Sequence, residues 1–293
     1  MGLVFPPRPA RCPVSELVSI VMPAYNNGEY VGATVRTVLA QTYRNWELLF
    51  VDDASTDRTA EIVASFHDPR IRIFRNEKNL GAALSRNRAL REAKGKWIAF
   101  LDADDWWHPK KLERQLRFMQ ETGHSFTCTD HRRNAGGKWA DAIQTGPLLL
   151  TKRKLYRYCY IYTGTVMYDR DQIGLVQIAD LKKNNDYAMW LKIIEKADCH
   201  RLPECLSFYI KHGGSISSGN KIKLIRWHYA LFNQGQGFGP VVSALLTLNN
   251  LVFGILKKTF CRRKVNEKDR RMTEETQAIC ENAQVLKTTI CNK

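Results

Sequence analysis

The feature that most constrains the fold is a regular alternation of short apolar runs and helix-like stretches across the first half of the chain. Four compact runs rich in β-branched and aromatic residues predict strands: Val18–Pro23, Trp46–Val51, Ile71–Phe74 and Trp97–Leu101. Apolar residues at helical spacing predict helices between them, at Tyr30–Gln41 and Asn79–Ala93. These strands are too apolar to face water, so the pattern predicts an α/β fold with a mostly parallel sheet flanked by helices.

Four regions can be distinguished along the 293 residues. Residues 1–15 are Pro-rich and are expected to form an N-terminal arm. Residues 16–125 carry the alternating pattern, and residues 126–219 mix short strands with one helix. Residues 220–293 are basic and helical in pattern, so we expect a helical tail.

Net charge and cysteine content restrict the kinds of partner and the cellular compartment that we expect. The net charge is +16, from 45 Lys and Arg against 29 Asp and Glu. This indicates an anionic partner, which could be nucleic acid, lipid headgroups or a phosphate-bearing substrate. The eight cysteines form no C-x-x-C pair, which argues against a zinc site, and we expect reduced thiols in a cytosolic compartment. The N-terminus has no apolar run that fits a signal peptide.

Polar residues follow the predicted strands where parallel strands end. Strand one ends in Pro23-Ala24-Tyr25-Asn26, strand two in Asp52-Asp53 and strand four in Asp102-Ala103-Asp104-Asp105. Ligands bind at the carboxyl ends of such strands. Asp102 and Asp104 could share one divalent ion, and Mg²⁺ or Mn²⁺ prefers oxygen ligands of this kind. The alternative is that Asp102 and Asp105 only cap the turn toward Pro109.

No glycine-rich phosphate loop is present. Neither G-x-G-x-x-G after a strand nor a Walker A sequence occurs, which disfavours a dinucleotide site. A phosphate-bearing ligand would therefore be held by a metal and basic side chains.

Four motifs that follow one another in order resemble the GT-A-fold family 2 glycosyltransferases, which use nucleotide-activated sugars. They are Val18–Asn26, Val51–Asp57, Asn79-Leu80-Gly81 with Arg86-Asn87, and Asp102–Asp105. The resemblance is strong over about residues 17–125 and continues to about residue 219. It implies that residues 16–125 form a nucleotide-sugar-binding lobe and residues 126–219 an acceptor-binding lobe.

The resemblance implies a donor site, residue by residue. Asp53 would accept a hydrogen bond from the nucleobase, Arg86 would reach the nucleotide or brace Asp102, and Asp102 would bind ribose. The alternatives are a helix cap for Asp53 and a solvated helix face for Arg86. The residues expected to bind the nucleotide-sugar are Pro23, Ala24, Tyr25, Asp53, Arg86, Asp102, Ala103 and Lys211.

A divalent metal and a diphosphate contact are implied in the same way. Asp104 would ligate Mn²⁺ or Mg²⁺, with His212 as a further ligand, and the metal would neutralise charge on the leaving group. Lys211 and His212 belong to Phe208–Ser217, which resembles a family segment that folds over the diphosphate. Relatives often carry Arg where this chain has Ile210.

The general base is implied by Asn184–Leu191, which resembles the family's acidic pair followed by Trp. Asp186 would take the proton from the acceptor hydroxyl, and attack from the far face would invert the configuration. Asn185 stands where the first acid often is. The alternatives are an N-cap for Asp186 and either sugar stacking or a core position for Trp190.

The C-terminal tail suggests contact with a membrane. Pro240–Leu256 is mostly apolar but shorter than the about 20 residues of a membrane span. Lys257–Arg271 then holds eight Lys and Arg against two acids. This pair fits attachment to an anionic membrane surface, and the alternative is a core helix with a solvated charge run. Spacing from Thr276 to Ile290 leaves a homo-oligomer contact open.

The resemblance implies an inverting, metal-dependent glycosyltransferase. It would move a sugar from a nucleotide-sugar donor, a UDP-sugar by preference, to a hydroxyl of a glycan or glycolipid acceptor in surface polysaccharide or lipopolysaccharide synthesis. We expect a cytoplasmic protein peripheral to the inner membrane, without a nucleic-acid partner. The alternatives are a sugar nucleotidyltransferase, a nucleic-acid-binding protein and a catalytically weak relative that only binds the donor.

Overall fold

The structure is a computed structural model in which the backbone of residues 16–212 and 221–290 is described. Side chains are described for residues 16–212, 224–254 and 261–281. The predicted N-terminal arm, and residues 213–217 of the predicted diphosphate segment, lie outside this part of the chain.

Four parallel strands form the first half of the sheet, where the apolar runs predict them. β1 (Val18–Ala24) lies between β2 (Trp46–Asp52) and β4 (Trp97–Phe100), and β3 (Ile71–Arg75) pairs with β2. Their order, β3-β2-β1-β4, brings the ends of β1, β2 and β4 to one rim.

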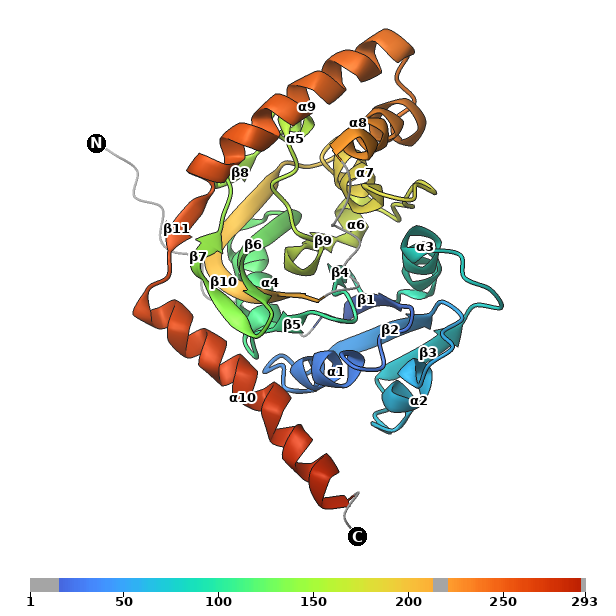
Figure 1. Ribbon diagram of the computed structural model, residues 1–293, viewed down its shortest axis with the longest axis vertical. Coiled ribbons are helices and arrows are strands. Elements are labelled where there is room, and N and C mark those ends of the chain that lie inside the picture. Colours follow the sequence, from blue (N-terminus) through green and yellow to red (C-terminus); the bar gives the residue numbers. More distant parts are fainter. Residues whose placement is uncertain (1–15, 213–220, 291–293) are drawn as a thin grey trace, which may run out of the picture.

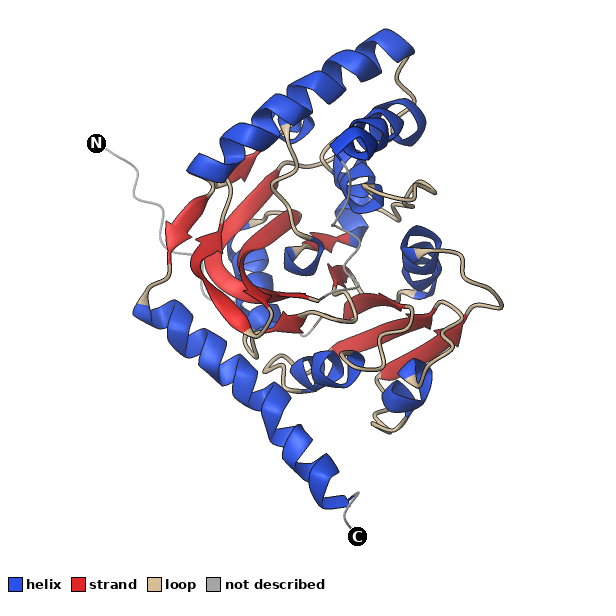
Figure 2. Ribbon diagram, viewed as in Figure 1, coloured by secondary structure: helices blue, strands red, loops and turns tan. Residues whose placement is uncertain are grey.

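Helices cover both faces of this sheet (Figure 2). Ile20 of β1 belongs to a core that includes residues of α1 and α4, whereas Val21 belongs to a second core shared with α3 and α7. Successive side chains of a strand point to opposite faces, so a strand buried on both faces is apolar at most positions. The helices around the sheet are α1 (Val31–Leu39), α2 (Thr59–Ala64), α3 (Ala82–Glu92), α4 (Lys111–Thr122) and α7 (Asn185–Ile193).

The second half of the sheet is mixed in direction. β9 (Met167–Asp169) pairs antiparallel with β4, and β6 (Phe126–Ala135) continues the sheet from β9. β10 (Cys199–Lys211) runs parallel to β6, and β7 (Lys138–Gln144) pairs antiparallel with β6. The remaining short elements are β5 (Trp106–Trp107), β8 (Leu149–Leu150), β11 (Arg262–Lys264), α5 (Lys152–Arg157), α6 (Arg170–Ile173) and η1 (Thr163–Thr165).

The tail is helical, as expected, and parts of it pack on the rest of the chain. α8 (Lys221–Ala230), a π-helical turn η2 (Leu231–Gly235) and α9 (Pro240–Phe260) precede α10 (Glu267–Ile290), which lies against α1 and β10 (Figure 1). Within the described residues, no helix is both long and apolar enough to cross a membrane.

Some tail residues that the sequence analysis assigned to external contacts are engaged within the chain. Arg263 forms an ion pair with Asp269, and Lys268 pairs with Glu204 at 3.0 Å. Thr276, the first residue of the spacing that left an oligomer contact open, is buried. These contacts occupy part of the predicted basic cluster.

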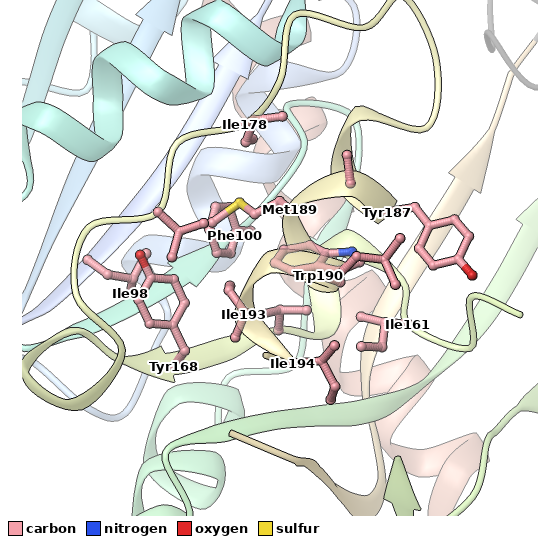
Figure 3. Close-up of a cluster of buried hydrophobic side chains, with 14 of the residues drawn as sticks. Ile98, Phe100, Ile161, Tyr168, Ile178, Tyr187, Met189, Trp190, Ile193 and Ile194 are labelled. Atoms are coloured by element: carbon pink, nitrogen blue, oxygen red, sulfur yellow. The ribbon is translucent and has the colours of Figure 1, made fainter. Parts of the chain in front are cut away.

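Trp190 is a core residue. It is 1% exposed, and its ring meets Phe100 edge to face at 5.1 Å between ring centroids. Figure 3 shows it among Tyr168, Met189 and Ile193 in the core that α7 shares with the sheet. The alternative that Trp190 stacks on a sugar ring is therefore wrong. Cys128, Cys199, Cys205 and Cys280 carry free thiols.

One buried amine offers a test of this packing. The Lys111 side chain is fully buried, its Nζ lies 3.8 Å from the centroid of the Trp107 ring, and it has no hydrogen-bond partner among the described residues. Burial lowers the pKa of Lys111 well below its ordinary value. We expect Lys111→Met to raise the free energy of unfolding at neutral pH by about 1–3 kcal/mol, because an unpaired buried polar group is removed.

The stability gained by Lys111→Met should depend on pH, because the pKa of Lys111 differs between the folded and unfolded states. An amine whose pKa is lowered on folding binds fewer protons in the folded state, so the wild type gains stability as pH rises toward the ordinary lysine pKa of about 10.4. The advantage of Lys111→Met in urea unfolding should therefore shrink as pH rises from about 7 toward this value. Lys110→Met, at an exposed neighbour, is the control. An advantage that does not depend on pH would contradict the assignment.

Candidate active site

The ends of β1 and β2 are joined by side-chain hydrogen bonds. Asn26 has a left-handed backbone (φ 52°), its N–H donates to Ser55 Oγ at 3.0 Å, and its Oδ1 accepts from the Thr56 N–H at 2.9 Å. Pro23 and Ala24 are buried at the end of β1, whereas Tyr25 is 47% exposed. The rim thus presents one aromatic ring to solvent above a fixed backbone.

Asp53 is buried directly after β2. Its carboxylate accepts hydrogen bonds from Asn76 Nδ2 at 2.6 Å, the Leu80 N–H at 2.9 Å and the Gly81 N–H at 2.7 Å. Helix α2 begins after Arg58 and has no side-chain cap, so Asp53 is not its cap. Asp53 instead fixes the loop that leads into α3.

Three carboxylates gather after β4. Asp105 is 1% exposed and accepts from the Tyr162 hydroxyl and, at 3.1 Å, from the Ile210 N–H. Burial, with the nearby charges of Asp104 and Asp102, raises the pKa of Asp105 well above its ordinary value. Asp105 therefore holds the end of β10 and the segment before η1 against the rim.

Asp104 lies beside His212, the residue that follows β10. The distance from Asp104 Oδ2 to His212 Nε2 is 2.7 Å, and the His212 ring stacks on Tyr30 at 4.3 Å between ring centroids. Burial and the charge of Asp102 raise the pKa of Asp104, although His212 opposes them. The structure thus brings together the two residues predicted as metal ligands, with half-buried Lys211 next to them in sequence.

Arg86 joins this rim to helix α7. Its guanidinium donates to Asp102 Oδ1 at 2.5 Å and to Asn185 Oδ1 at 3.0 Å. The residue is 7% exposed, so it does not lie on a solvated helix face. Burial opposes the charge, but Asp102 and Asp186 outweigh it and raise the pKa of Arg86. Asn185 can accept this hydrogen bond as the expected acid would, without adding a negative charge.

Asp186 stands at the start of α7. Its Oδ2 accepts from Thr163 Oγ1 at 3.1 Å, and its Oδ1 accepts from the Tyr187 N–H at 2.7 Å. Asn184, with a left-handed backbone, is the N-cap residue, so Asp186 lies inside the first turn. The carboxylate is half-buried and held from two sides.

The rim suits a divalent cation whose ligands come partly from the protein and partly from a phosphate. Asp104 supplies oxygen and His212 nitrogen at one place. The described part of the chain contains no group of three or more His, Cys, Asp or Glu that could hold a metal alone. Two protein ligands fit Mg²⁺ or Mn²⁺, because such ions commonly complete their shell with substrate phosphate and water.

Residues 19–172, more than half of the chain, match the family model described as glycosyl transferase family 2. The chain belongs to this family. It is a glycosyltransferase rather than a sugar nucleotidyltransferase.

Two bacterial relatives are similar to this family 2 glycosyltransferase over most of their length. TuaG of Bacillus subtilis, whose name assigns it to teichuronic acid biosynthesis, is 38% identical over 222 residues, covering 74% of this chain and 88% of TuaG. WfgD of Escherichia coli is a UDP-Glc:alpha-D-GlcNAc-diphosphoundecaprenol beta-1,3-glucosyltransferase. It is 36% identical over 251 residues, covering 83% of this chain and 96% of WfgD.

A solved structure confirms the fold. TarS of S. aureus, in complex with UDP-GlcNAc, superposes with a TM-score of 0.65 at 19% identity, covering 80% of this chain and 71% of that one. The predicted GT-A fold of this family 2 glycosyltransferase is therefore confirmed.

Three residues of the site were missed by sequence reasoning. Asn76 bonds Asp53, Tyr162 bonds Asp105 and Thr163 bonds Asp186. Each lies in a connecting segment between motifs of the family 2 glycosyltransferase, and its partner is distant in the sequence. No local pattern signals such contacts, so only the folded chain reveals them.

Proposed function

We propose that this glycosyltransferase moves a sugar from a UDP-sugar to a hydroxyl of a lipid-linked glycan, with inversion at the anomeric carbon. The contact that supports this most directly is Arg86, which bonds both Asp102 at the donor rim and Asn185 beside Asp186. It ties the expected donor site to the expected base through one side chain.

The donor would lie along the rim. We assign the base pocket to Pro23, Ala24 and the exposed Tyr25, with Asp53 as the nucleobase acceptor. Asp53 Oδ2 accepts one hydrogen bond within the chain, from the Gly81 N–H, and a carboxylate oxygen can accept a second. The ribose would contact Asp102 and Ala103, and the diphosphate Lys211. WfgD uses UDP-Glc by name, which supports uracil as the base.

Asp104 and His212 would hold Mn²⁺ or Mg²⁺. When bound, the cation neutralises negative charge on the departing diphosphate. Asp104 Oδ2, after β4, and His212 Nε2, after β10, lie 2.7 Å apart, which supports this assignment.

Asp186 would act as general base. Its carboxylate takes the proton of the acceptor hydroxyl as that oxygen bonds to the anomeric carbon. The bond from the anomeric carbon to the diphosphate oxygen breaks, and UDP leaves with the electron pair. Because attack comes from the face opposite the diphosphate, the configuration inverts.

The acceptor would be carried on a lipid. By name, WfgD acts on a sugar linked to diphosphoundecaprenol, and TuaG belongs to teichuronic acid biosynthesis. We assign acceptor binding to residues 126–219 and place the enzyme at the cytoplasmic face of the inner membrane, as a peripheral protein in surface polysaccharide synthesis.

A donor screen tests the proposal. Purified protein is mixed with UDP-, GDP- and dTDP-sugars, with and without Mn²⁺ or Mg²⁺, and thermal shift and nucleotide release are read. We expect a metal-dependent shift with UDP-sugars that Asp104→Ala abolishes, and that Glu61→Ala, at an exposed acid on α2, preserves. Absence of a shift with every nucleotide would refute the donor assignment.

The hydroxyl of Thr163 gives a second test, of the base. Thr163 is 3% exposed, so Thr163→Val preserves volume while removing the hydrogen bond to Asp186. We expect kcat to fall about tenfold, since the loss of one hydrogen bond to a charged group corresponds to about 1.5 kcal/mol. Donor KM should not change. Thr163→Ser, which retains the hydroxyl, should keep most of the activity, and equal losses in both variants would contradict this role.

A further inference from the structure

Helix α9 is amphipathic in the opposite sense from a helix of a soluble protein. Four apolar side chains on one stripe, spaced four, three and four residues apart, are exposed: Val241 at 71%, Leu245 at 63%, Leu248 at 62% and Val252 at 48%. The buried side chains of the same helix include polar ones, namely Ser243, Thr247 and Asn250, each at most 4% exposed. A surface helix ordinarily buries its apolar stripe, so this orientation indicates an apolar environment outside α9.

Helix α8 extends the apolar surface. Leu224, Ile225 and Tyr229 are 45%, 49% and 36% exposed. An open groove of about 520 Å³ runs between α8 and α9, with Ile225, Tyr229 and Leu248 among its lining residues. We call the exposed apolar residues of α8 and α9 the apolar face. Helix α9 lies along the outer edge of the molecule, next to α5 (Figure 1).

Positive charge borders this face. Lys152, Arg153 and Lys154 of α5 are exposed, Lys152 forms a surface ion pair with Glu195, and α5 packs against α9. The Arg157 guanidinium lies 5.3 Å from the centroid of the Phe253 ring of α9. The sequence has no Asp or Glu between Glu204 and Glu267, a stretch that includes both helices. The charge next to the apolar face therefore matches an anionic surface.

We propose that the apolar face docks in the interfacial layer of an anionic phospholipid bilayer, with the α5 cations at the headgroups. An apolar helix face bordered by Lys and Arg binds such surfaces through buried area and electrostatic attraction together. In the basic cluster Lys257–Arg271, Arg263 and Lys268 pair with carboxylates of the chain, whereas Arg262, Lys264 and Arg270 are exposed. The cations of α5 therefore add to the positive charge of this cluster.

Docking would bring helix α7 close to the membrane. Asn250 of α9 donates to the Tyr187 hydroxyl at 2.8 Å, and Tyr187 follows Asp186 on α7. The face is thus joined by a buried hydrogen bond to the helix that carries the proposed base. This consequence rests on the proposed function, because it requires an acceptor carried on a lipid, whereas the docking itself does not.

Vesicle binding tests the proposal. The full chain is sedimented with vesicles of phosphatidylcholine alone, or of phosphatidylcholine with phosphatidylglycerol, at low and high salt. We expect binding to the phosphatidylglycerol vesicles that weakens with salt, because exposed charges are screened. The double variant Leu245→Asp with Leu248→Asp should bind at least about tenfold more weakly, since burying one leucine is worth about 1.5–3 kcal/mol. Leu175→Asp, at an exposed leucine outside both helices, is the control.

Each outcome is decisive. Donor-induced thermal shift, read in parallel, should be the same for all variants, so a failed donor site and a failed docking face are distinguishable. Reversing the charges of Lys152, Arg153 and Lys154 to Glu should lower binding to phosphatidylglycerol vesicles. Equal vesicle binding by the double variant, or none by the wild type, would overturn the proposal. A dimer in sedimentation velocity that the double variant dissociates, without vesicle binding, would assign the face to a second copy instead.

Discussion

Replacement of Asp186 by Asn is expected to lower kcat by about 10²–10⁴-fold, the usual contribution of a positioned general base. Asparagine preserves the shape of the side chain, and its carbonyl oxygen can still accept from Thr163 or from the Tyr187 N–H. It cannot take a proton from an acceptor hydroxyl. The loss should therefore appear in kcat, while donor KM and the free energy of unfolding remain close to those of the wild type.

The measurement is steady-state transfer to a lipid-linked acceptor, with donor titration and urea unfolding on the same preparations. Asp180→Asn removes an exposed carboxylate from the segment that leads into α7, and it should leave kcat unchanged. If Asp186→Asn retained more than a tenth of the wild-type kcat, the base would have to be another group.

The donor rim could be predicted from the sequence because its geometry follows from local patterns. A strand buried on both faces is apolar along most of its length, so the carboxylates at the ends of β2 and β4 mark where these strands end. Parallel pairing then places Asp53 and Asp102 at one rim regardless of detail. The same argument does not reach the acceptor side, where the strands run in both directions.

The hairpin of β6 and β7 could not be predicted from apolar periodicity. β6 carries buried polar residues, and Asp130 pairs with Arg201 of β10 at 2.6 Å and with Arg263 of β11 at 3.6 Å. The available signal was the Gly136-Gly137 pair, whose positive φ angles of 60° and 78° suit a hairpin turn. Ion pairs between distant segments replace apolar packing here, and no local pattern encodes them.

The orientation of α9 could not be predicted from the sequence either. The sequence shows an apolar stretch that contains Asn249 and Asn250, and a core helix fits it as well as a surface one. Asn250 faces inward, and its amide donates a hydrogen bond to the Tyr187 hydroxyl. The apolar stripe of α9 is exposed in this orientation. A single tertiary hydrogen bond thus accompanies an orientation that composition alone leaves open.

Arg86→Met should be the most destabilising substitution in the site, lowering the free energy of unfolding by about 3 kcal/mol. Removing one partner of a buried ion pair costs about 3–5 kcal/mol, because the other charge stays desolvated. We expect a cost at the lower end of this range, because the Asp102 side chain is 28% exposed and stays partly hydrated, whereas that of Arg86 is 8% exposed. Arg91→Met, at the exposed end of the same helix, should cost far less.

The double variant Arg86→Met with Asp102→Asn separates the ion pair from the rest of the effect. If the pair carries most of the cost, the double variant should be more stable than the sum of the single changes predicts, by about 1–3 kcal/mol. Arg86→Lys retains the charge but lacks the planar fork that reaches Asp102 and Asn185 together. It should therefore keep more stability than Arg86→Met and still lose transfer activity. Full activity in Arg86→Lys would show that the link between the donor rim and α7 is not needed for catalysis, because a single ammonium cannot reproduce both hydrogen bonds in the same geometry.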